Sequence, residues 1–231
     1  DMIATIRSRC RHLGLRIPTA AAVADLLVRE GVATPDVALE AARAAQSHIG
    51  LARALARDPQ MRERRRAIIT APASVRSVGE AVMAADRLLE TAKAQADAQV
   101  SERNAREKAE LMRQLGMDEG ESATKASRTM IRQLEEDQKR RSKRALTDAI
   151  DRALIDLLAI YRDVLMVQVG GDGELINTDL ADLVHEIAQD STPRQTLARV
   201  DHIETARKRL VSNGNPLLVL EDMAISLRPQ A

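Results

Sequence analysis

The 231-residue sequence contains no phenylalanine and no tryptophan, and Tyr161 is its single aromatic residue. A core built from this chain must therefore be aliphatic, made of Leu, Ile, Val, Ala and Met side chains. The lack of aromatic rings also argues against a protein that binds single-stranded nucleic acid by stacking bases on its side chains.

Cysteine, glycine and proline are also scarce. Cys10 is the single cysteine, which excludes an intrachain disulfide and a cysteine-based zinc site within this chain. Such cysteine usage suits the reducing cytoplasm. Ten glycines and seven prolines in a chain rich in Ala, Leu, Arg and Glu indicate a strongly helical protein, so we expect an all-α fold.

Neither sign of charge dominates the sequence. Lys and Arg number 35 and Asp and Glu 34, a net charge of +1, which gives no global electrostatic footprint for nucleic acid. No apolar run approaches the roughly 18 residues of a membrane span, so we expect a cytoplasmic protein without a membrane partner. The chain begins with Asp1 at what reads as a late strand, and we expect an upstream domain to be missing from it.

A short β-branched run at residues 3–6 leads into a cluster of three arginines. This pattern is typical of a strand that ends at guanidinium groups, whose planar fork binds phosphate oxygens bidentately. The alternative is a solvated basic strand end with no ligand. The arginines are Arg7, Arg9 and Arg11.

The tripeptide Ser8-Arg9-Cys10 resembles the Ser-Arg-Cys motif of clamp-loader subunits, which are related to AAA-plus ATPases. The resemblance extends over nearly the full chain. Residues 189–228, with Ser191-Thr192-Pro193 and the run from Asn213 to Leu218, are similar to the last helices of bacterial DNA polymerase III delta-prime subunits. The long middle segment suggests the actinobacterial type.

The resemblance implies three parts. Residues 1–16 would be the end of the nucleotide-binding domain, and residues 17–71 the helical lid. Residues 72–231 would form the helical collar domain, with a long charged helical hairpin inserted at about 85–145. Pro72 would mark the boundary between lid and collar.

The resemblance also implies a function. A delta-prime subunit is a stator-like part of the complex that loads the sliding clamp on primed DNA. Arg9 would be an arginine finger in trans, supported by Ser8 and Cys10, at the ATP and magnesium site of a neighbouring gamma/tau subunit. This chain would bind no cofactor and have no independent catalysis within the DNA polymerase III holoenzyme. Its partners would be the gamma/tau and delta subunits and, through the complex, the sliding clamp and primer-template DNA.

The lid departs from the pattern of the active ATPases. Those subunits carry Gly-Ser-x-Arg at the start of the third lid helix, and the corresponding residues here are 47–50, with Gly50 in place of the sensing arginine. This favours a delta-prime subunit over an active gamma/tau-type ATPase. The gamma/tau type remains an alternative, as does a helical scaffold with no link to ATP. We expect His48 and Arg53 to be an ordinary, partly exposed pair on a lid helix.

Apolar periodicity and helix caps predict helices throughout the chain. The basic run at residues 61–66 is expected to be a solvated helix face or a linker. The last helix carries apolar residues on more than a narrow stripe, so part of it should face another subunit. The predicted interface residues are Leu217, Leu220, Met223 and Leu227.

The hairpin carries five cations between residues 139 and 144. If its helices are antiparallel, residues near 100 face residues near 138, which places Glu102, Glu107 and Glu110 roughly opposite these cations. We therefore favour a self-neutralising hairpin, since paired charges release few counterions, and leave DNA contact as the alternative.

The remaining chemistry-bearing residues give no catalytic pattern. The four histidines lack the spacing of metal ligands, so we expect no metal site. We expect Cys10 to have a packing role, although His12 lies two residues away on the same side of the proposed strand. The histidines are His12, His48, His185 and His202.

Overall fold

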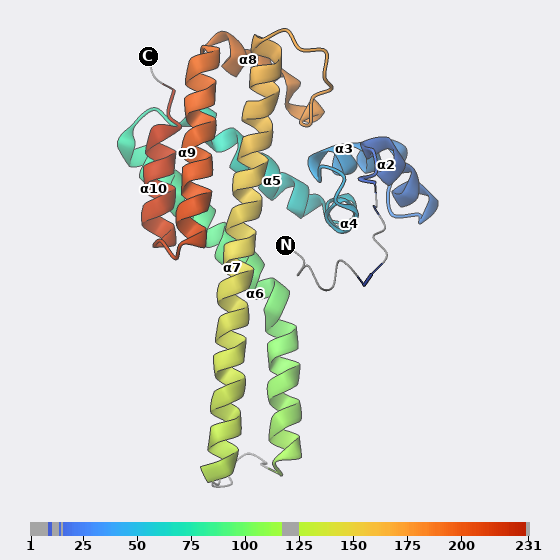
Figure 1. Ribbon diagram of the computed structural model, residues 1–231, viewed down its shortest axis with the longest axis vertical. Helices are drawn as coiled ribbons and strands as arrows, with labels where there is room; N and C mark the ends of the chain where they lie inside the picture. The colour runs from blue at the N-terminus through green and yellow to red at the C-terminus, as the bar shows by residue number, and fades with distance from the viewer. Residues whose placement is uncertain (1–8, 11–13, 15, 117–124, 230–231) are drawn as a thin grey trace. The chain divides into compact units, whose positions relative to one another are not determined.

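The computed structural model describes residues 9–10, 14, 16–116 and 125–229 (Figure 1). Every regular element within these residues is a helix, which confirms the all-α fold predicted from composition. The strand expected before Arg9 falls on residues outside this part of the chain.

The first compact unit contains residues up to Arg62 together with Ile176–Asp179. Thr19 caps its first helix by accepting a hydrogen bond from the Ala22 amide (3.2 Å), and Gly31 takes a left-handed φ of +65° just after the helix ends. Eight alanines accompany the larger core residues Val23, Leu27 and Leu55. The helices are α2 (Ala20–Arg29), α3 (Pro35–Ala44) and α4 (Ile49–Arg57).

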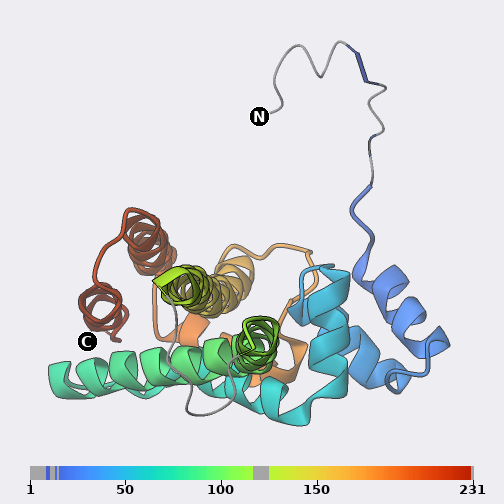
Figure 2. The same ribbon diagram turned by 90° about the horizontal axis from the view of Figure 1, so that it is seen from below.

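The second compact unit comprises Glu63–Leu175 and Leu180–Ala231. Helix α7 packs against α6, α8 and α9, and α10 packs against α6 and α9. Figure 2, which looks along the hairpin, shows α9 beside α7 and α10 beside α9. The helices that it contains or shares with the first unit are α5 (Pro59–Ser74), α6 (Val78–Gln114), α7 (Lys125–Gln168), the 3-10 helix η1 (Thr178–Leu180), α8 (Ala181–Gln189), α9 (Pro193–Val211) and α10 (Pro216–Ser226).

Leucine, isoleucine and valine dominate the core of the second unit, with Leu154 and Leu220 completely buried. Local caps fix where its helices begin. Ser77 and Glu80 form a capping box at α6, and Thr192 forms one with Gln195 at α9. The Asn215 side chain accepts hydrogen bonds at the start of α10.

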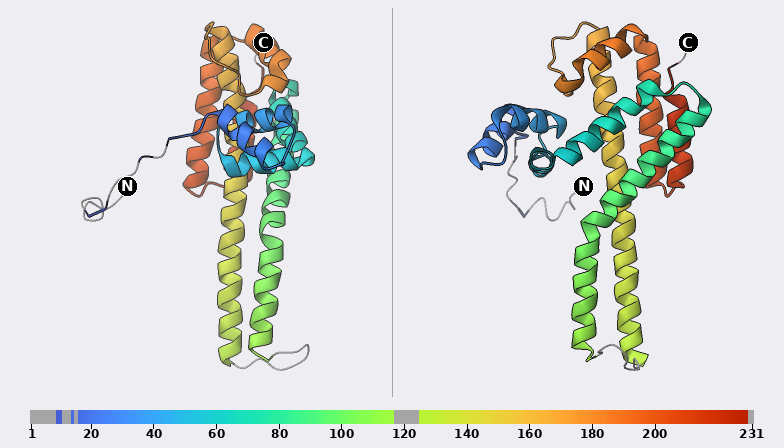
Figure 3. Two further views of the ribbon diagram at one scale, coloured as in Figure 1. Left: turned by 90° about the vertical axis from the view of Figure 1, so that its right-hand side faces the viewer. Right: turned by 180° about the vertical axis from the view of Figure 1, so that it is seen from behind.

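Helices α6 and α7 form the predicted hairpin and lie side by side along its length (Figures 1 and 3). A small apolar cluster of Ala96, Val100 and Ala145, with Leu146 packed against it, joins the two helices. The small side chains let the helix backbones approach closely, but they bury little apolar area. Polar contacts must therefore contribute to the pairing beyond this cluster.

Pro72, which the sequence suggests as the boundary between lid and collar, does not end a helix. It lies inside α5, which continues to Ser74, and the division between the compact units falls earlier in that helix, between Arg62 and Glu63. The assignment of residues 17–71 as a lid and of residues 72–231 as a collar stays a prediction. Within the described residues, no helix is both long enough and apolar enough to cross a membrane.

Candidate functional site

Of the proposed arginine-finger motif, the structure describes Arg9 and Cys10, and both residues are exposed. Ser8 lies outside the described residues, as do Arg7, Arg11 and His12. Cys10 is an exposed free thiol, and the packing role expected for it stays a prediction. An exposed guanidinium at Arg9 is accessible to a group outside the chain.

Residues 47–50 start the helix in which the ATPase pattern places a sensing arginine. His48 caps α4, its Nδ1 accepting a hydrogen bond from the Leu51 amide at 3.1 Å, and Gly50 lies in the first turn. Arg53 donates to Glu30 from both Nε and Nη2, at 2.8–3.0 Å. Arg53 is thus held in an ion pair on a helix surface, in keeping with an ordinary structural role.

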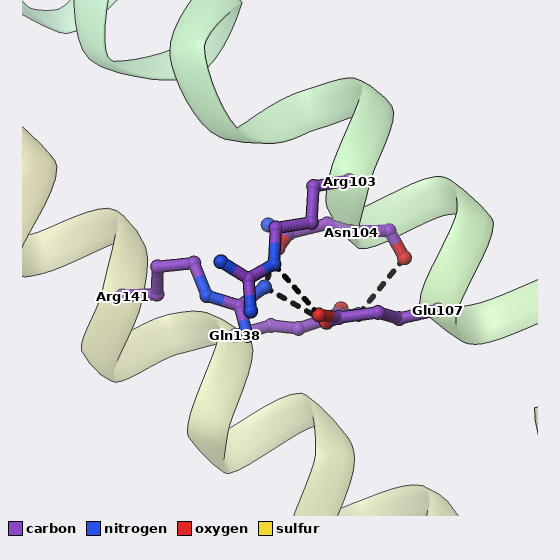
Figure 4. Close-up of polar contacts among 5 residues, drawn as sticks. All are labelled: Arg103, Asn104, Glu107, Gln138 and Arg141. Carbon is purple, nitrogen blue, oxygen red and sulfur yellow. Dashed lines mark hydrogen bonds and ion pairs between the residues drawn. The ribbon is translucent and has the colours of Figure 1, made fainter.

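The hairpin contains a polar cluster that links its two helices (Figure 4). Arg141 on α7 donates from Nη1 to Oε2 of Glu107 and to Oδ1 of Asn104 on α6, each at 2.8 Å. Gln138 donates from Nε2 to the Asn104 carbonyl at 2.9 Å, and Arg103 Nε donates to Oε1 of Glu107 at 2.9 Å. The hydrogen bonds from Arg141 and then Arg103 lower the pKa of Glu107 to about 2.

The self-neutralising pairing predicted from sequence is only partly present. Glu107 does face a cation of the 139–144 run, but Glu102 pairs with Arg106 on its own helix at 2.6 Å. Glu110 has no ion pair among the described residues. Lys108 and Glu135, at 3.4 Å, form a second pair across the helices that the sequence did not indicate. Exposed charges four residues apart on one helix are already neighbours, which is why Glu102 finds its partner locally.

The basic run at residues 61–66 was expected to be solvated, and this was wrong for two of its arginines. Arg62 donates from Nη1 to the carbonyls of Leu55 (2.6 Å) and Ala56 (3.1 Å) at the end of α4. Arg65 donates from Nε to Oδ1 of Asp156 at 2.9 Å, in a pair that is largely buried. Asp156 is the sequence signal that could have predicted this buried pair, because it is a carboxylate among the apolar positions of α7 and needs a cation beside it.

An apolar hollow of about 220 Å³ lies between α5, α6 and α10. Met223 and Leu227, two of the predicted interface residues, line it, together with Ile68 and Leu88. Most of the surface of Met223 and Leu227 is nevertheless buried in this chain's own core.

The other two predicted interface residues are also covered, wholly or in part, by this chain's own core. Leu220 is completely buried and Leu217 is partly buried against the core. Leu218, by contrast, is 62% exposed. The interface on α10 therefore stays a prediction, and its accessible part consists of Leu218 and the hollow.

No group of three or more His, Cys, Asp or Glu side chains that could hold a metal ion occurs in the described part of the chain. His185 contacts the Ala181 carbonyl through Nδ1 at 2.7 Å, within its own helix.

Residues 122–228 match the family model for the C-terminal part of the DNA polymerase III delta subunit. The chain is also 36% identical over 72 residues to DNA polymerase III subunit delta' of Bacillus subtilis (strain 168). That match covers 31% of this chain and 22% of the relative, so the chain spans only a small part of the relative that it matches. No solved structure matches the chain.

Proposed function

We propose that the chain is part of a clamp-loader subunit and that its C-terminal half is a delta-prime-type region of DNA polymerase III. The single observation that carries the proposal is the match of residues 122–228, which covers the helices of the second compact unit from α7 to α10. Its partners in this role are the gamma/tau and delta subunits, the sliding clamp and primer-template DNA.

In this proposal Arg9 acts in trans on ATP and magnesium held by a neighbouring gamma/tau subunit. Its guanidinium would stabilise the charge that develops on the transferred phosphoryl group. The exposure of Arg9 supports this role, because an inserted finger must be free of contacts within its own chain. Gly50 supports a subunit that does not hydrolyse ATP itself, since a glycine offers no guanidinium to the phosphates.

The test is the ATPase activity of the reconstituted clamp loader carrying Arg9→Ala. Loss of a finger reduces phosphoryl transfer by roughly 10³-fold or more where it acts alone, and by less where other subunits supply further fingers. We expect reduced clamp- and DNA-stimulated hydrolysis with normal assembly on a sizing column. Arg9→Lys should not restore the rate, because an ammonium group cannot bind two phosphate oxygens in a planar fork.

The matched control is Arg16→Ala, which removes an exposed arginine close in sequence but outside the motif. We expect it to hydrolyse ATP at the wild-type rate. Equal rates in the Arg9→Ala and wild-type complexes would remove the finger from the proposal while leaving subunit membership intact. Failure of the chain to enter the complex at all would remove both.

A further inference from the structure

A groove of about 600 Å³ runs along the seam of α6 and α7. Four cations line it, Lys93 from α6 and three residues of α7, against the two carboxylates Asp97 and Glu136. The groove wall therefore carries a net charge of about +2, although the whole chain is nearly neutral. The cations of α7 are Lys139, Arg140 and Lys143.

Neither acid of the groove forms an ion pair with these four cations among the described residues. Glu136 pairs with Arg132, at 3.2 Å, and Arg132 does not line the groove. Lys93 pairs with Glu90 and Arg140 with Asp137, and both of these acids lie outside the groove on the same helix as their partner. Such exposed pairs between near neighbours are weak and give way readily to a ligand.

The two remaining lysines are the most available of the four. Lys139 has no ion pair among the described residues, and Lys143 donates only to the neutral Oδ1 of Asn213, at 3.1 Å. Both side chains are exposed. They lie one helical turn apart, a rise of about 6 Å at 1.5 Å per residue, which is close to the roughly 7 Å spanned by two nucleotide steps of 3.4 Å along one strand.

We propose that this groove binds the phosphate backbone of duplex nucleic acid. Lysines recognise phosphates as point charges, without reading the bases. The groove has no aromatic side chain on which an unpaired base could stack, so its contacts are to the backbone and independent of sequence. The Ser142 hydroxyl lies in the same wall and can donate to a phosphate oxygen. The inference stands on the hairpin alone and does not depend on Arg9.

The test measures binding of the full chain to a fluorescein-labelled DNA duplex by anisotropy, between about 50 and 200 mM salt. The variant Lys139→Gln with Lys143→Gln removes two phosphate contacts. We expect its affinity to fall roughly 10-fold at the low-salt end, and the slope of log affinity against log salt to flatten by about 1.8. Circular dichroism should show unchanged helicity, because both lysines are exposed.

A charge-matched control is Lys108→Gln with Arg113→Gln, which removes two exposed cations of the hairpin outside the groove. We expect it to lose less than about 2-fold in affinity. Equal losses in the two variants would mean diffuse attraction to the hairpin, and no loss in the groove variant would mean that the lysines are only solvated. Either result overturns the proposal. A labelled polyglutamate peptide is the second ligand to test. If it binds as tightly as the duplex, and the groove variant loses that binding, the partner of the groove is an acidic protein and not nucleic acid.

Discussion

Arg65 on α5 and Asp156 on α7 join two helices through an ion pair whose side chains are only 10% and 9% exposed. Burial raises the pKa of Asp156, while the nearby Arg65 guanidinium opposes that shift. The two effects compete because the carboxylate has lost its water and gained a cation. The Arg65 guanidinium therefore stabilises the ionised form of Asp156 inside an aliphatic core.

Arg65→Met should destabilise the second unit by about 3 kcal/mol, because it leaves the Asp156 carboxylate buried without its arginine. Urea denaturation of the chain measures the change. Adding Asp156→Leu to Arg65→Met should recover most of the loss, since an apolar pair needs no solvation.

The matched control for this substitution is Arg66→Met, at the exposed neighbour of Arg65, which we expect to cost less than about 0.5 kcal/mol. If Arg65→Met were as harmless as Arg66→Met, the pair would contribute nothing to the fold and Asp156 would be solvated in some other way.

At the scale of elements, the hairpin depends on the polar cluster around Glu107 as well as on its small apolar cluster. The pKa of this carboxyl is lowered from 4.5 to about 2 by Arg141 and Arg103. A lowered folded-state pKa means that the ionised form is favoured by folding. The cluster therefore stabilises the hairpin above about pH 4.5 and loses that contribution as the pH falls towards 2.

A carboxyl-carbon NMR titration should place the midpoint of Glu107 near pH 2. In Arg141→Gln the midpoint should move up towards 4.5, and by more than in Arg103→Gln, since Arg141 makes the larger contribution. Arg106→Gln is the control, because Arg106 pairs with Glu102 and should leave Glu107 unchanged. A midpoint for Glu107 near 4.5 in the wild-type chain would show that α6 and α7 are not joined by this cluster in solution.

The helices were predictable because their signals are local. Ser77 with Glu80 and Thr192 with Gln195 fix helix starts through contacts only three residues apart, which can be read directly from sequence. Charge pairing across the hairpin was not predictable to the same degree. Glu102 pairs with Arg106, four residues away on its own helix, and not with the cations of α7, a choice that depends on side-chain geometry.

At the scale of the whole molecule, Leu218 is a large apolar residue of α10 that stays exposed, and in the proposed clamp-loader role it would contact another subunit. Leu218→Asp, at a 62% exposed position of α10, should leave the chain folded but weaken its entry into the clamp loader. Leu220→Asp, two residues on at a completely buried position, should instead lower the melting temperature sharply by burying an unpaired charge. Thermal denaturation and sizing chromatography with the partner subunits separate the two effects.

Val211→Asp is the matched control for Leu218→Asp, since Val211 is an exposed apolar residue at the end of α9. We expect it to assemble normally. Wild-type assembly of Leu218→Asp would place the subunit contact elsewhere than on α10.

The candidate site was less accessible to prediction than the fold. The Ser-Arg-Cys segment and Gly50 could be found because a short motif carries them. The lysines of the groove could not, because Lys93 lies nearly fifty residues away from Lys139 and Lys143 and joins them only when α6 and α7 pair. The sequence showed the cations of α7, but it did not show which of them would have no ion pair with an acidic side chain.

Helix α7 runs unbroken from Lys125 in the hairpin to Gln168 in the core of the second unit, with no glycine or proline inside it. Sharp bends in helices come mostly from such residues, so α7 has no built-in hinge. The part of α7 that lies in the hairpin, from Lys125 to Ala145, is about 30 Å long at 1.5 Å per residue. The helix is therefore stiff along its whole length. A force applied to the hairpin is passed on to Leu157 and the other buried residues that hold the C-terminal part of α7 in the core.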